Sequence, residues 1–74
     1  MEEVLETFAG RIRGLRVEQG LGVRELAAKL GISHTAISLS ENRKRTPDIA
    51  TCKKFADFFG VTGDYLIGLS NERR

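Results

Sequence analysis

The sequence predicts an all-α fold built from five short helices. Apolar residues recur at spacings of three and four along successive segments, which places them on one face of a helix. Glycines stand where these segments would end, and glycine most readily adopts the positive φ found just past a helix end. Ser33 and Thr62 stand where later helices would begin, and both residue types are preferred N-caps. With 74 residues, the chain is expected to form one small domain over 1–74.

Residues 2–19 are expected to form the first helix, which Gly20 would end. Its apolar stripe consists of Leu5, Phe8, Ile12 and Leu15. Gly10 and Gly14 each weaken a helix by about 1 kcal/mol relative to alanine. We therefore expect tertiary packing to offset that cost, or another helix to approach closely at these glycines.

The stretch 23–42 has the layout of a helix-turn-helix. Residues 23–30 are expected to be helical, with Leu26, Ala27 and Leu30 on one face. Gly31 would supply the turn, and Ser33 would cap a second helix running from His34 to Ser40 or Asn42. The second helix of this motif enters the major groove of DNA, so the layout predicts DNA binding.

A polar and basic loop, NRKRTPD, follows over residues 42–48. Pro47 suits the first turn of a following helix. Two more helices are expected, from about Asp48 to Phe59 and from about Gly63 to Gly68. The last residues, 70–74, are polar and are expected to fray.

The apolar faces of these helices predict one hydrophobic core. Its expected members are Leu5, Phe8, Ile12, Leu15, Leu21, Leu26, Ala27, Leu30, Ile37, Ile49, Cys52, Phe55, Ala56, Phe59, Val61 and Leu66. Phe55, Phe58 and Phe59 recur at helical spacing, which favours core packing over a platform for stacking bases.

Composition excludes several classes of protein. The single cysteine, Cys52, rules out an internal disulfide and a cysteine-based zinc site, and it fits a reducing cytoplasm. No apolar run approaches the roughly 20 residues of a membrane span. The acidic start, MEEVLETFAG, is unlike a signal peptide. We expect a cytoplasmic protein with no membrane association, metal or cofactor, which is either a stand-alone regulator or an N-terminal domain.

Catalytic motifs are absent from the sequence. It contains no HExxH, no glycine-rich phosphate loop and no paired carboxylates in an apolar setting, so we expect no enzyme. Cys52 lies on an apolar stripe and is interpreted as a core residue rather than a reactive thiol. The one histidine, His34, is interpreted either as a plain surface residue or as a nucleic-acid contact.

Positive charge is concentrated in the middle of the chain. Residues 24–54 contain seven basic and three acidic side chains, whereas residues 1–19 contain four acids and three arginines. A local excess of basic residues is typical of a surface that binds a phosphate backbone, although a solvated basic face has the same pattern.

The chain resembles the lambda-repressor-like family of phage repressor and Cro-type helix-turn-helix domains. The resemblance covers about four fifths of the chain, 8–68. It is carried by FxxRIRxLR from Phe8, ELAxKLGIS from Glu25, ISxxENxKRxP from Ile37 and FADFFGVTxDYLIG from Phe55. No single piece is very specific, but their order and spacing are. The resemblance implies a five-helix DNA-binding domain.

The resemblance also implies roles for particular residues. The helix from Ser33 to about Ser40 would be the recognition helix. The residues at DNA-contacting positions are Ser33, His34, Thr35, Ser38, Leu39, Asn42, Arg43, Lys44 and Arg45. Arg16 and Glu41 match an ion pair that links the first helix to the end of the third. Contacts in a homodimer would involve Val61, Tyr65, Leu66 or Leu69.

Four positions depart from the family pattern. Val23 stands where a glutamine usually touches DNA, and Leu39 replaces a polar or basic contact residue. Ser40 replaces a residue that packs inward, which would hold the third helix loosely. Arg43 replaces a glycine at a position where positive φ is common, which costs about 1 kcal/mol or changes the turn.

Two functions fit these patterns. The first is a sequence-specific, homodimeric regulator of transcription, most simply a repressor, that binds double-stranded DNA. The second is a protein-interaction module, such as an antitoxin or antirepressor, that binds a protein partner through an exposed apolar patch at Val23 and Leu39.

Overall fold

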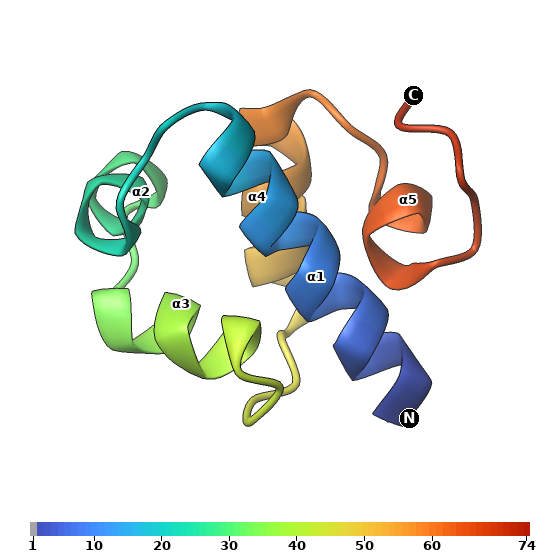
Figure 1. Cartoon of the computed structure of the whole chain (residues 1–74), viewed down its shortest axis with the longest axis horizontal. Coiled ribbons are helices and arrows are strands. Elements are labelled where there is room, and N and C mark those ends of the chain that lie inside the picture. The colour runs from blue at the N-terminus through green and yellow to red at the C-terminus, as the bar shows by residue number, and fades with distance from the viewer. Residues whose placement is uncertain (1) are drawn as a thin grey trace.

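The computed structural model describes residues 2–74 and confirms the all-α prediction (Figure 1). Its helices are α1 (Glu2–Glu18), α2 (Val23–Leu30), α3 (His34–Glu41), α4 (Ile49–Phe59) and α5 (Gly63–Ile67). These bounds differ from the predicted ones by single residues at the ends of α1, α3 and α5 and at the start of α4. None of the described helices is long and apolar enough to cross a membrane.

Helix α1 runs through the middle of the molecule, with α2 and α3 on one side of it and α5 on the other (Figure 1). It packs against α3 and α5, while α2 packs against α3 and α4. The buried core comprises Phe8, Ile12, Leu15, Leu26, Ala27, Leu30, Ile37, Phe55, Ala56, Phe59 and Leu66. The rings of Phe8 and Phe55 meet edge to face at its centre, with centroids 5.6 Å apart. The apolar stripes of all five helices thus share one interior.

The predicted core is wrong at one residue. Ile49 is 88 % exposed, because it is the first residue of α4 and the part of that helix packed against the core begins one turn later, at Cys52. Four other expected members, Leu5, Leu21, Cys52 and Val61, are only partly buried. Burial raises the pKa of the Cys52 thiol, which keeps it protonated and fits an unreactive packing role.

The helix starts are capped largely as predicted. The hydroxyl of Ser33 accepts from the Ala36 N–H at 3.1 Å, and that of Thr62 accepts from the Tyr65 N–H at 3.0 Å. Helix α4 differs, because Asp48 has extended backbone angles and serves as the N-cap, accepting from the Thr51 N–H at 2.7 Å. Pro47 therefore lies just before the N-cap. The prediction that it stands in the first turn of the helix is wrong.

The Asp48 cap makes stability depend on pH. The hydrogen bond from the Thr51 N–H lowers the pKa of Asp48 in the folded state. A lowered folded pKa contributes stability that is present above the unfolded value, about 3.9, and lost as the pH falls through the folded value. Asparagine also caps helices but does not titrate. In urea unfolding, wild type should therefore lose stability relative to Asp48→Asn as the pH falls below about 4, whereas a constant difference would contradict this.

The glycines of α1 do not mark a close helix contact. A Cβ added at Gly10 or Gly14 would meet no heavy atom within 4 Å outside the local helix backbone, so the expected close approach is wrong. Gly14→Ala should then raise the free energy of unfolding by about 1 kcal/mol in thermal or chemical unfolding. Gly31→Ala is the contrasting control, because φ is +70° there and alanine would be strained. No gain for Gly14→Ala would contradict the prediction.

The prediction that the polar C-terminal residues fray is wrong. The Thr62 N–H donates to the Arg73 carbonyl at 2.8 Å, and the Arg73 guanidinium pairs with Glu18 at 2.5 Å. Arg11 also holds this segment, donating to the Ser70 carbonyl at 2.7 Å. The segment after α5, which runs beside that helix in Figure 1, is thus tied to α1 and to the start of α5 by these contacts.

Candidate nucleic-acid interface

Helix α3 presents its outer face to solvent beside a basic loop. His34 and Thr35, in its first turn, are exposed, while Ser38 and Leu39 are partly buried. A shallow, open depression of about 500 Å³ is lined by His34, Thr35, Ser38, Leu39, Asn42 and Lys44. Six of the nine predicted DNA-binding residues therefore meet on one surface. Ser33 caps the start of the same helix, while Arg43 and Arg45 lie outside the depression.

The inner face of α3 fixes this surface on the body of the domain. Ile37 is fully buried, and Ser40 is 3 % exposed, so the position where the family has an apolar residue does pack inward. Arg16 and Glu41 form a bidentate ion pair. The Arg16 Nε lies 2.7 Å from the Glu41 Oε2, and the Arg16 Nη2 lies 2.9 Å from the Glu41 Oε1. Both side chains are largely buried, 14 % and 9 % exposed.

Arg16, on α1, connects that helix to the end of α3 and to the loop before α2. Besides Glu41 it reaches the carbonyl of Leu21, to which its Nη1 donates at 2.8 Å. The hydrogen bond with Glu41 raises the pKa of Arg16 further above its already high value, so the guanidinium stays charged. One side chain of α1 thus sets the position of the end of α3 and of the connection into α2.

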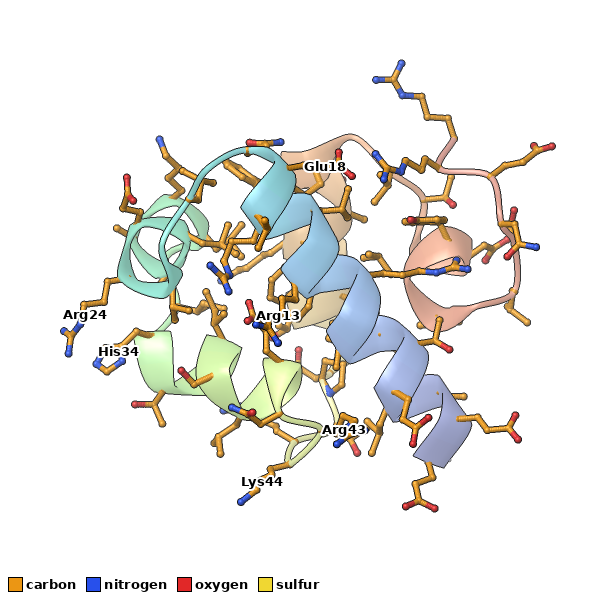
Figure 2. The ribbon with its side chains drawn as sticks, in the orientation of Figure 1. Arg13, Glu18, Arg24, His34, Arg43 and Lys44 are labelled. Atoms are coloured by element: carbon orange, nitrogen blue, oxygen red, sulfur yellow. The ribbon has the colours of Figure 1, made fainter. Side chains whose placement is uncertain are left out.

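The loop after α3 is tied to the last turn of that helix. Lys44 N–H donates to the Leu39 carbonyl at 2.8 Å, and the side-chain amide of Asn42 donates to the Ser38 carbonyl at 2.8 Å. Arg43 has φ of +62°, the conformation expected where the family has glycine. Its guanidinium lies 3.7 Å from Glu6 of α1, whereas Lys44 points away from the body (Figure 2). Lys44 and Arg45 are both exposed.

Arg24 is one of four basic residues that were counted in the charge excess but not predicted as contacts. Arg24, in the first turn of α2, is exposed and points outward on the same side of the molecule as His34 (Figure 2). Sequence spacing alone could not assign Arg24 to this side, because that depends on the angle between α2 and α3.

Comparison with known proteins identifies the family. Residues 12–66 match a family described as helix-turn-helix. The chain belongs to the Cro/C1-type helix-turn-helix family. No solved structure matches it significantly.

Three relatives of this helix-turn-helix chain carry names of transcription regulators. It is 44 % identical over 64 residues to the transcriptional repressor RghR of Bacillus subtilis, covering 85 % of this chain and 47 % of the relative. It is 35 % identical over 54 residues to the phage CTXphi transcriptional repressor RstR of Vibrio cholerae, covering 73 % and 49 %. It is 34 % identical over 58 residues to the transcriptional regulator ImmR of Bacillus subtilis, covering 78 % and 46 %. The chain thus spans about half the length of these curated relatives.

The helix-turn-helix does not display the apolar patch expected at Val23 and Leu39. Val23 is partly buried and packs against the core, and Leu39 is also only partly exposed. Within residues 2–74, the exposed large apolar side chains are instead Val4, Val17, Ile49 and Leu69. The protein-interaction hypothesis therefore loses the observation that motivated it.

The residues predicted for a dimer contact differ in accessibility. Leu69 is 74 % exposed, and Val61 and Tyr65 are partly buried. Leu66 is fully buried, so its side chain belongs to the core and cannot touch a partner in this conformation, which corrects that prediction. The ring of Tyr65 is covered by Arg11, whose guanidinium carbon lies 4.2 Å from the ring centroid.

Proposed function

We propose that this chain binds double-stranded DNA sequence-specifically, with α3 in the major groove, and regulates transcription as a repressor. The observation that carries the proposal is the single exposed surface on which His34, Thr35, Ser38, Leu39, Asn42 and Lys44 meet. The names of the relatives support it, because RghR and RstR are both named transcriptional repressors. If this chain is part of a longer protein, the same proposal applies to that protein.

Affinity and specificity would come from different residues. Lys44 and Arg45, exposed on the loop, supply charge for two phosphates, and Asn42 adds a polar contact. His34, Thr35 and Ser38 can hydrogen-bond base edges from the first two turns of α3. Leu39 offers only an apolar surface, which suits the methyl group of thymine. Specificity would then rest on few side chains.

A domain of this size covers about one half-site, so we propose that it acts as a homodimer on two half-sites one helical turn apart. The accessible part of the predicted interface is Leu69 with the edges of Val61 and Tyr65. Leu69→Lys should shift the protein toward monomer in analytical ultracentrifugation and weaken binding to the two-half-site duplex. An unchanged sedimentation profile would count against this interface.

The proposed location is the cytoplasm, where a bacterial or phage genome is accessible.

Selection of binding sites from random duplex DNA tests the function most broadly. We expect enrichment of a two-fold symmetric sequence, followed by tighter binding to that duplex than to a scrambled one in fluorescence anisotropy at two salt concentrations. Failure to enrich any sequence, with no duplex bound below the micromolar range at low salt, would refute the proposal.

A further inference from the structure

A second depression lies between α1 and the loop that follows α3. Two arginines, Arg13 and Arg43, line it together with Glu6, Glu41 and Asn42. Asn42 also lines the depression on the α3 face, so the two hollows adjoin. We propose that a DNA phosphate occupies this second depression, with Arg13 of α1 as a phosphate contact and Glu6 as its intramolecular competitor. The inference rests on the proposed DNA binding and adds two residues to it.

The charges in the depression leave one guanidinium without an acceptor. Glu41 already accepts two hydrogen bonds from the Arg16 guanidinium. Arg43 faces Glu6 at 3.7 Å, but both side chains are more than half exposed, 59 % and 57 %, so this pair is weak and easily exchanged. Arg13 is exposed, and nothing in residues 2–74 accepts a hydrogen bond from its guanidinium. Arg13 and Arg43 together thus outnumber Glu6, the one acid of the depression that Arg16 does not hold.

The position of Arg13 is fixed relative to the recognition helix. It precedes Arg16 by three residues on α1, about one turn, and Arg16 binds the end of α3. Figure 2 shows Arg13 on the side of α1 that faces α3. The depression measures about 280 Å³ and is open to solvent. A Cβ added at Gly10, which lines it, would meet no heavy atom within 4 Å outside the local helix backbone.

The two guanidinium groups that line this depression suit a phosphate. Guanidinium groups bind phosphate oxygens through two parallel hydrogen bonds, and their planar fork loses less freedom per hydrogen bond than an ammonium does. Glu6 would be displaced from Arg43 when the phosphate enters, because a phosphate oxygen and a carboxylate compete for the same donors. DNA binding at this site is therefore opposed by an acid of the protein itself.

Four variants test the assignment on the duplex recovered by selection. Arg13→Ala should weaken binding about fivefold and reduce the slope of log Kobs against log salt by about 0.9, the value for one phosphate contact. Arg13→Lys should keep the slope but recover only part of the affinity, because an ammonium cannot form the two-pronged contact. Glu6→Gln should tighten binding about threefold. Arg74→Ala is the matched control, since it removes the same charge from the far C-terminal segment.

The outcomes separate this inference from the proposed function. If wild type binds the duplex but Arg13→Ala matches Arg74→Ala in both Kd and slope, the phosphate site is refuted and the proposed function stands. Tighter binding by Arg13→Ala, or weaker binding by Glu6→Gln, would also overturn it. If wild type binds no duplex, both proposals fall. Thermal unfolding of Arg13→Ala and Arg13→Lys should match wild type, because the exposed side chain makes no hydrogen bond or ion pair with residues 2–74.

Discussion

Replacing Arg16 with methionine is expected to lower the free energy of unfolding by about 3–5 kcal/mol. The change leaves Glu41, whose side chain is only 9 % exposed, as a charge with no partner. It also removes the donor to the Leu21 carbonyl, which fastens the connection between α1 and α2. Most of this loss of stability comes from leaving the desolvated Glu41 carboxylate without a partner. The attraction between the two side chains contributes less, because a buried ion pair is little more stabilising than an apolar pair. Urea unfolding followed by circular dichroism measures it.

The double variant Arg16→Met with Glu41→Leu separates these two contributions. If stranding dominates, removing the second charge recovers most of the lost stability, and the coupling energy in the double-mutant cycle is large. An Arg16→Met protein as stable as wild type would show that the pair does not hold α3 in place. DNA affinity provides a second measurement, since a displaced α3 weakens binding even where the fold survives.

Replacing both Lys44 and Arg45 with alanine is expected to weaken DNA binding by at least tenfold at moderate salt. Two phosphate contacts would reduce the slope of log Kobs against log salt by about 1.8. Specific and scrambled duplexes should lose affinity about equally, because phosphates carry no sequence information. Fluorescence anisotropy over a salt series gives both quantities.

The control for this pair removes two positive charges elsewhere, through Lys53→Ala and Arg74→Ala. Lys53 is paired with Asp57 on α4, and Arg74 lies in the C-terminal segment. These changes should leave the salt slope near that of wild type. Equal effects of the two double variants would mean that net charge, rather than a contact at the loop, governs the interaction.

The parts of the fold encoded by neighbouring residues were predictable. Gly31 and Ser33 define the turn between α2 and α3 by their own backbone and side-chain preferences, and the structure has the αL glycine and the serine cap. The positive φ of Arg43 is one of the two outcomes that the family pattern left open. The hydrogen bonds of Gly31 with Ala27 and of Ser33 with Ala36 span four residues or fewer.

The features that sequence could not supply depend on distant segments. Ile49 continued the apolar periodicity of α4, but only the packing of the other helices shows that its first turn has no cover. The order of the C-terminal segment depends on Glu18, 55 positions before Arg73. The closeness of Arg13, Arg43 and Glu6 likewise follows from the way α1 packs on α3. Residues that are separated in sequence and meet only through packing leave no local signal.

Amide chemical-shift mapping with the selected duplex is the most direct test of where this chain binds DNA. A ¹⁵N-labelled sample of the 74-residue chain is suited to it, because each amide reports its own surroundings. The account predicts that the largest shifts cluster over residues 33–45, the first turn of α2 and the part of α1 around Arg13, with smaller changes across α5 and residues 69–74. Shifts centred on α5 and the C-terminal segment, with the α3 amides unmoved, would contradict it.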